Sequence, residues 1–148
     1  MAGDDPRSVL GAGLGHDFQA DGLYLRALTH PSYANEHAPE PDNEALAFLG
    51  DAVLGLIVAE HLWATAPGEP VGVLTPRRAE VVSGSSLARW AERLGVGAHL
   101  RLGRGEQRMG GHSKESVLAT ALEALLAVVY LEAGLPAARR AIALLALW

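Results

Sequence analysis

Apolar residues recur along the chain with the spacing of α-helices, and the alternation typical of a half-buried strand is scarce. The broadest apolar band lies between residues 44 and 65, where leucine, isoleucine, valine and alanine fill most positions. A band this wide predicts a central helix that is largely buried. The pattern therefore favours an all-α fold in which further helices pack around one central helix.

Prolines, glycines and small polar residues divide the rest of the chain into shorter segments. The first residues are rich in glycine and aspartate, which is unlike a packed element. The segments predicted are a flexible leader over 1–19, helices over 23–28, 44–65, 75–94, 113–134 and 136–148, and a mobile basic loop over 96–112.

Length and composition narrow the class of protein. The 148 residues suffice for one domain, which we place over residues 20–148. The absence of cysteine excludes disulfide scaffolds and zinc–thiolate sites, and it fits a reducing, cytoplasmic compartment. No signal peptide is evident, and we expect no membrane-spanning segment.

The formal net charge of −5 argues mildly against a nucleic-acid partner, but the basic residues are unevenly distributed. They form two groups, which are either solvated surface residues or contacts to phosphate. The candidates for phosphate contact are Arg101, Arg104, Arg108 and Lys114 in one group, and Arg77 and Arg78 in the other.

Two predicted helices carry carboxylates within apolar segments. Glu44 and Asp51 are seven residues apart, close to two helical turns, so they share one face. Gly50, directly before Asp51, is costly inside a helix and indicates that a missing side chain is needed there. Glu123 lies in the middle of the strongly apolar segment 119–127.

Charged side chains are seldom buried without a partner. Asp51 and Glu123 could face one another and form an oxygen site suited to Mg²⁺. Alternatively, Glu123 pairs with an arginine such as Arg78 or Arg93, and the spacing alone does not decide between the two.

Residues 43–54, NEALAFLGDAVL, resemble the signature helix of the ribonuclease III family. Further segments resemble the family's other motifs and follow the family's order. These are residues 29–36 (THPSYANE), 72–75 (GVLT) followed by Arg78-Ala79, 102–106 (LGRGE), and 116–124 (SVLATALEA). The resemblance covers about residues 22–135.

The resemblance implies an all-α endonuclease domain that works as a homodimer. It would cut double-stranded RNA, and not DNA, with Mg²⁺ (or Mn²⁺ in its place), leaving 5′-phosphate and 3′-hydroxyl ends. Asp51 and Glu123 would hold the metal, and Glu44 would orient a water or a ligand. Phe48 would insert into the partner's signature helix; an ordinary core phenylalanine is the alternative.

The departures from the family pattern concern acids. Ala47, Val71 and Thr120 occupy positions that are usually acidic, and the chain carries no double-stranded-RNA-binding domain before Trp148. Two interpretations follow. The first is a catalytic domain similar to Mini-ribonuclease III, which processes RNA such as ribosomal RNA precursors with two acidic ligands. The second is a non-catalytic homologue that serves as an RNA-binding or ribosome-associated structural dimer.

Overall fold

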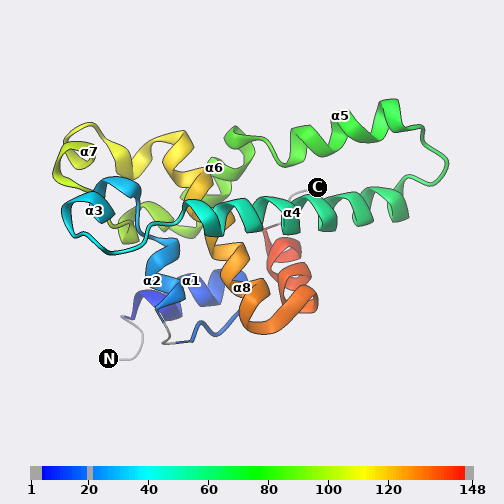
Figure 1. Ribbon diagram of the computed structural model, residues 1–148. Coiled ribbons are helices and arrows are strands. Elements are labelled where there is room, and N and C mark those ends of the chain that lie inside the picture. The colour runs from blue at the N-terminus through cyan, green and yellow to red at the C-terminus, as the bar shows by residue number, and fades with distance from the viewer. Residues whose placement is uncertain (1–4, 20–21, 146–148) are drawn as a thin grey trace.

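The computed structural model describes residues 5–19 and 22–145, and in these ranges it is helical apart from connecting segments and one isolated bridge between Thr29 and Arg101. Figure 1 shows the arrangement. The helices are α1 (Pro6–Leu14), α2 (Leu23–Ala27), α3 (Pro31–Glu36), α4 (Glu44–Thr65), α5 (Val71–Val81), α6 (Gly84–Leu94), η2 (Val96–His99), α7 (Arg104–Arg108), η3 (Gly111–Ser113) and α8 (Glu115–Leu144). The predicted all-α class is confirmed.

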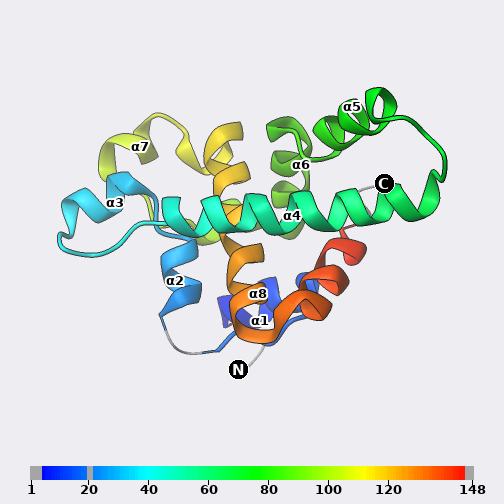
Figure 2. The same ribbon diagram turned by 45° about the vertical axis from the view of Figure 1, so that its right-hand side comes forward.

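The centre of the fold is α8, where the sequence pattern favoured the helix over 44–65. Its first half runs through the middle of the body, and α4 crosses it (Figures 1 and 2). Nearly every residue from Val117 to Val129 is buried. Helix α4 has the predicted ends, but one side of it is exposed. The apolar pattern therefore predicted both long helices, but it did not show which of the two is buried more deeply.

Helices α4 and α8 are long and apolar enough to cross a bilayer by length and composition alone. Both pack against each other and against the shorter helices of the body, which buries most of the apolar stretch of α8 and a smaller part of that of α4.

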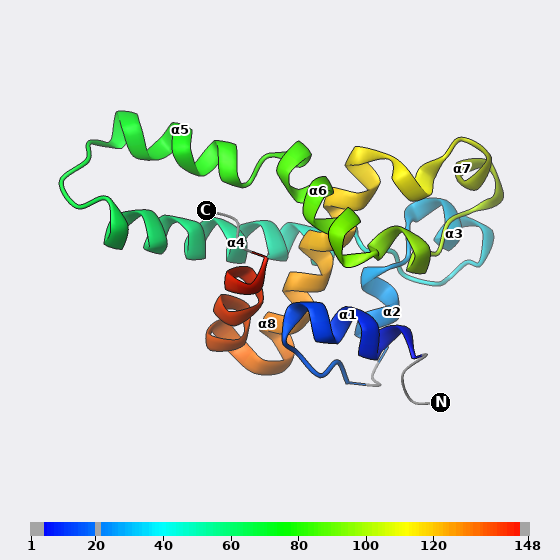
Figure 3. The ribbon, with the colours of Figure 1, turned by 180° about the vertical axis from the view of Figure 1, so that it is seen from behind.

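The end of α4 and all of α5 extend beyond the body as an arm, seen from the front in Figure 1 and from behind in Figure 3. Helix α5 buries none of its residues. The single helix predicted over 75–94 is wrong, because the chain forms two helices there. The Ser83 side chain accepts a hydrogen bond from the Ser86 N–H (3.2 Å) and starts α6, and Pro76 lies inside α5.

The predicted break after residue 134 is present within α8. Gly134 adopts φ 77°, a left-handed value that glycine accommodates, and Pro136 follows it. The helix begins at Glu115 rather than at a Ser113 cap. The predicted helix end at Trp148 lies outside the described residues.

Residues 5–19 form a packed element where the sequence predicted a flexible leader. The Asp5 side chain accepts the Arg7 N–H (2.9 Å) and caps α1. Leu10 and Leu14 of this helix are fully buried. The predicted basic loop over 96–112 likewise contains three short helices, η2, α7 and the start of η3. Short helices like these contribute only a few buried apolar residues each, which is too few to produce a recognisable periodic pattern in the sequence.

Candidate functional site

The site begins with the crossing of α4 and α8. A Cβ atom added to Gly50 would collide with the backbone carbonyl of Glu123, so only glycine permits this approach of the two helices. The missing side chain inferred from the sequence is therefore required by the neighbouring backbone. Because Asp51 follows Gly50 directly, the same crossing brings the Asp51 carboxylate to Glu123.

Asp51 is exposed and Glu123 is about half-buried at this crossing. Burial, together with the hydrogen bond and the negative charge of Asp51, raises the pKa of Glu123 to about 8. In the absence of a cation, Glu123 is therefore protonated at neutral pH and donates to Asp51. No ion pair joins Glu123 to Arg78 or Arg93 in the described part of the chain. The arginine alternative left open by the sequence is thus contradicted.

The chemistry of this pair fits a divalent cation such as Mg²⁺. Two carboxylates that repel each other unless one is protonated offer hard oxygen ligands, and Mg²⁺ is often held by only one or two carboxylates plus waters. Residues 5–19 and 22–145 hold no group of three or more histidine, cysteine or acidic side chains suited to a metal. Within the described part of the chain, Asp51 and Glu123 are therefore the carboxylates that this crossing offers to a cation.

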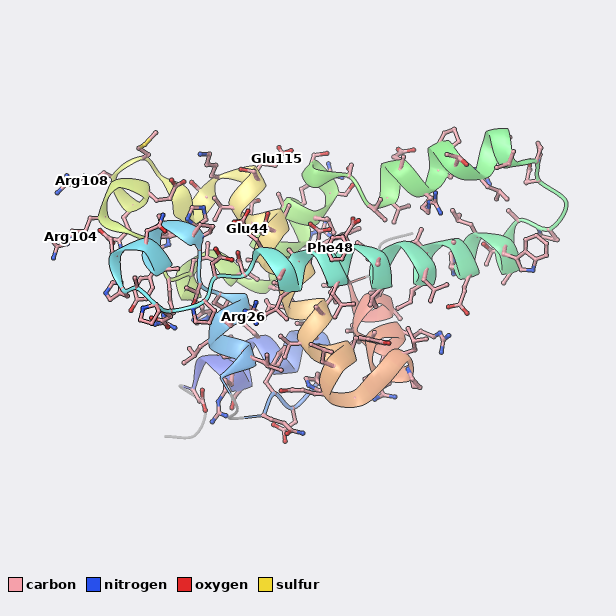
Figure 4. The ribbon with its side chains drawn as sticks, viewed as in Figure 1. Arg26, Glu44, Phe48, Arg104, Arg108 and Glu115 are labelled. Atoms are coloured by element: carbon pink, nitrogen blue, oxygen red, sulfur yellow. The ribbon has the colours of Figure 1, made fainter. Side chains whose placement is uncertain are left out.

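Glu44 lies at the start of α4, two turns before Asp51, with its side chain exposed (Figure 4). It lines a small cleft of about 120 Å³ together with Asn43, Ser116 and Thr120. The structure thus joins Asp51 to Glu123 and puts Glu44 beside the neighbouring turn of α8.

Ala47 and Thr120, at two positions that we expect from the resemblance to be usually acidic, flank this pair. Ala47 is buried on the α4 face between Glu44 and Asp51. Thr120 lies one turn before Glu123, and its hydroxyl donates to the Ser116 carbonyl (2.8 Å). Neither side chain can carry a negative charge, so neither adds a carboxylate to the pair of Asp51 and Glu123.

Val71, at the third position that we expect to be usually acidic, is the first residue of α5 and is 75% exposed. Helix α5 begins at the far end of the arm, away from the crossing of α4 and α8 (Figure 1). Arg77 and Arg78 are exposed on the same helix. Within one chain, Val71, Arg77 and Arg78 therefore lie away from the acid pair.

Arg104 and Arg108 lie on α7 and point away from the body (Figure 4). The start of α7 is held by α3, because the Arg104 N–H donates to both carboxylate oxygens of Glu36 (3.1 Å each) and the Gly103 N–H donates to Ser32 Oγ (2.8 Å). Sequence reasoning missed these supports. The family-like segment over 29–36 was the available signal, and its role here is to fix the basic helix.

The other two basic candidates near α7 are engaged. The Arg101 guanidinium forms an ion pair with Glu40 (2.6 Å) and stacks on the Tyr33 ring at 4.3 Å. Lys114 forms an exposed ion pair with Glu106 (3.5 Å). These contacts favour a structural role for Arg101, whereas Lys114 remains open to solvent.

Phe48 is 81% exposed on α4, so the alternative of an ordinary core phenylalanine is wrong. Leu56 and Trp63 of the same helix are also exposed, and all three lie within about 80° around the helix axis. Asp51 lies about 60° from Phe48 on the other side. An unpartnered apolar face therefore borders the acidic face.

The fold and the site define an all-helical domain that pairs two carboxylates where its two long helices cross. A family model described as ribonuclease-III-like matches residues 20–147. The chain therefore belongs to the ribonuclease III family.

Curated relatives support this placement. Ribonuclease 3 of Symbiobacterium thermophilum is 49% identical over 127 residues, which are 86% of this chain and 54% of that protein. Ribonuclease 3 of Streptomyces coelicolor is 47% identical over 131 residues, covering 88% of this chain and 47% of that protein. The chain spans about half the length of the curated relatives it matches.

Solved structures give the same result for the fold. A structure of the nuclease domain of ribonuclease III from Campylobacter jejuni, described as flexible in a region involved in dimer formation, has a TM-score of 0.85. It is 36% identical and covers 93% of this chain and 94% of that chain. A 2.2 Å crystal structure of the same nuclease domain has a TM-score of 0.84 at 35% identity, covering 95% and 94%.

Proposed function

We propose that this domain is a Mg²⁺-dependent endoribonuclease that cuts double-stranded RNA as a homodimer. The observation that carries the proposal is the contact between Asp51 and Glu123 at the Gly50 crossing, inside a domain of the ribonuclease III family. The cytoplasm is the compartment we propose, and ribosomal RNA precursors are the substrate we propose to test first.

When bound, Mg²⁺ activates a water and neutralises charge at the scissile phosphate. Asp51 and Glu123 would hold the ion, and Mn²⁺ suits the same oxygen ligands. To serve as a ligand, Glu123 would release its proton to solvent and give up the hydrogen bond that it donates to Asp51. Glu44, in the adjoining cleft, would orient a metal-bound water or a ligand by accepting a hydrogen bond from it.

The exposed face of α4 suits a second copy of the chain. Phe48 and Trp63 are large, rigid and almost fully exposed, which is the profile of residues that become anchors in an interface. A two-fold dimer through this face brings two acid pairs to one surface, one for each strand of a duplex. It also gives residues of the α5 arm a route to the partner's acids.

Phosphate contacts come from arginines that the fold leaves free. Arg104 and Arg108 on α7 and Arg77 and Arg78 on α5 are exposed. Arg101 acts by holding the loop before α4 through Glu40, and Lys114 adds charge beside α7. Recognition through backbone phosphates implies weak sequence specificity and binding that falls steeply with salt.

The low number of carboxylates favours a second candidate, a non-catalytic dimer that binds RNA or a ribosome. Ala47 and Thr120 leave the site with two protein ligands, so the dimer and the basic surface would remain while cleavage is lost.

Cleavage of a long double-stranded RNA by the wild type and by Asp51→Asn, each with Mg²⁺ or Mn²⁺, separates the candidates. We expect slow cleavage by the wild type and at least a hundredfold slower cleavage by the variant. A wild type that binds the RNA in Ca²⁺ but leaves it intact at high protein concentration would establish the non-catalytic role. Cleavage that persists in Asp51→Asn would remove the proposed site.

The double variant Ala47→Glu/Thr120→Asp sharpens the result. If the two substituted positions limit the reaction, restoring both carboxylates raises the rate and lowers the Mg²⁺ concentration required for half-maximal cleavage, by about tenfold or more. The single variants serve as controls, because each restores only one ligand.

A further inference from the structure

Helices α3, α4 and α8 begin around one cleft of about 120 Å³ beside the acid pair. Glu44 lines the cleft and lies two turns before Asp51 on α4. Thr120 lines it from α8, one turn before Glu123. The third helix contributes His30, which caps the start of α3. A ribose next to a phosphate at the acid pair would therefore have this cleft within reach.

The ring of His30 is held in place by hydrogen bonds within the chain. Its Nδ1 accepts the Ser32 N–H (3.1 Å) and lies 2.8 Å from the Ser32 Oγ, which accepts the Gly103 N–H (2.8 Å). The backbone N–H of His30 donates to the Arg101 carbonyl (3.0 Å). The orientation of the ring is thus determined before any ligand binds.

The opposite edge of the His30 ring carries a donor that the fold does not use. Because Nδ1 accepts the Ser32 N–H, the ring proton is on Nε2. In the described part of the chain Nε2 has no hydrogen-bond partner, and it is not one of the buried atoms that lack one, so a ligand can reach it. Capping accounts for Nδ1 alone, and asparagine or serine would cap α3 as well.

The donor and the acceptor of this cleft together suit a hydroxyl group. The exposed Glu44 carboxylate accepts hydrogen bonds, His30 Nε2 donates one, and a hydroxyl does both. A phosphate oxygen would be repelled by Glu44. The cleft is also well below the volume of sites that enclose larger ligands, so a nucleobase does not fit. Duplex RNA displays such a hydroxyl, the ribose 2′-OH, which DNA lacks.

We propose that His30 donates a hydrogen bond to the ribose 2′-hydroxyl of a nucleotide next to the scissile phosphate, while Glu44 accepts one from it. This assignment rests on the proposed function and names the ligand that Glu44 orients. His30 thereby becomes a residue that selects RNA over DNA at the site of cleavage.

Cleavage rates of two substrates by two proteins test the assignment. The substrates are a duplex RNA and the same duplex with one 2′-deoxy nucleotide, placed in turn on either side of the bond that the wild type cuts. The proteins are the wild type and His30→Asn, which keeps an acceptor for the Ser32 N–H but ends short of the Nε2 position. One deoxy position should slow the wild type about fivefold or more, and it should slow His30→Asn by about twofold or less.

On the unmodified RNA, His30→Asn should be about fivefold slower than the wild type, with a similar melting temperature. His37→Asn is the matched control and should behave as the wild type, because His37 is exposed at the other end of α3 and does not line the cleft. Equal rates of the wild type on the RNA and on both deoxy duplexes would overturn the assignment, and this comparison needs no variant.

Binding in Ca²⁺ separates this assignment from the proposed function. The ligands are the duplex RNA and a hybrid in which one strand is entirely 2′-deoxy. The loss of affinity for the hybrid should be about threefold smaller in His30→Asn than in the wild type. Cleavage with equal deoxy penalties in both proteins would remove the role of His30 and leave the nuclease. A difference in binding without any cleavage would remove the nuclease and leave the 2′-hydroxyl contact, and no binding to either duplex would remove both.

Discussion

At the scale of single residues, the most consequential group is the carboxyl of Glu123. A carboxyl is ordinarily ionised at neutral pH, but burial and the neighbouring Asp51 carboxylate raise the pKa of Glu123 so that it holds its proton there. In the protonated pair, the hydrogen bond removes the repulsion between the two carboxyl groups. A bound cation would remove the same repulsion while both groups are ionised. The residue is therefore neutral or metal-bound, and a free negative charge at this position is unfavourable.

A pH dependence of stability follows. The pKa of Glu123 is about 8 in the folded domain and near 4.5 when unfolded, so the folded state holds the extra proton between these values. Without metal, the free energy of unfolding should fall as the pH rises from about 5 through 8. Partial exposure limits the effect to on the order of 1 kcal/mol. Urea unfolding in EDTA at several pH values measures it.

Glu123→Gln keeps a donor toward Asp51 at every pH, so its stability should vary less over this interval and exceed that of the wild type near pH 8.5. Glu115→Gln, at an exposed position on the same helix, is the control and should follow the wild type. Identical pH profiles for wild type and Glu123→Gln would contradict the protonated pair.

At the scale of elements, the approach of α4 to α8 depends on one missing methyl group. Gly50→Ala should destabilise the domain by about 2 kcal/mol or more, because the new Cβ would collide with the Glu123 carbonyl, which belongs to a buried helix and cannot shift freely. It should also separate Asp51 from Glu123 and weaken metal binding. Thermal unfolding and Mn²⁺ titration measure the two effects.

Gly55 provides the matched control within α4. A Cβ added there meets nothing within 4 Å, so Gly55→Ala should leave the domain unchanged or stabilise it by up to about 1 kcal/mol through helix propensity. Equal effects of the two substitutions would show that Gly50 is not a close-packing position.

The elements also show what a sequence can and cannot predict. The ends of α4 were predictable because the Asp42 side chain, which accepts the Glu44 N–H, and a Pro-Gly segment act locally. The sequence left open whether Glu123 meets Asp51 or an arginine, because an acid in an apolar helix requires a partner but does not specify which one. The separation of α5 from α6 depends on one serine cap that resembles many surface serines. Arg101 could not be assigned, since its partner Glu40 lies 61 positions earlier and only the fold brings them together.

At the scale of the whole molecule, the notable feature is the apolar surface left along α4. The body buries nearly all of α8 from Val117 to Val129, whereas Phe48 and Trp63 of α4 face solvent at 81% and 78% exposure. A mostly apolar helix that the body covers on one side only leaves an exposed apolar surface, and such a surface can bind a partner. The acidic face borders this surface, so an assembly built on it would also determine how the two sites meet a duplex.

Phe48→Ala and Trp63→Ala should therefore each raise the dimer dissociation constant about thirtyfold, the effect expected for an interface anchor worth about 2 kcal/mol. Sedimentation velocity across a range of concentrations measures the shift. Neither side chain supports the core of its own chain, so circular dichroism should be unchanged, and RNA cleavage should recover at protein concentrations that restore the dimer. Met109→Ala, equally exposed on the opposite end of the body at α7, should leave the assembly intact. A wild type that remains monomeric at 100 times the concentration used for cleavage (about 100 μM against about 1 μM) would contradict the dimer, because a face of this size should associate well below that range.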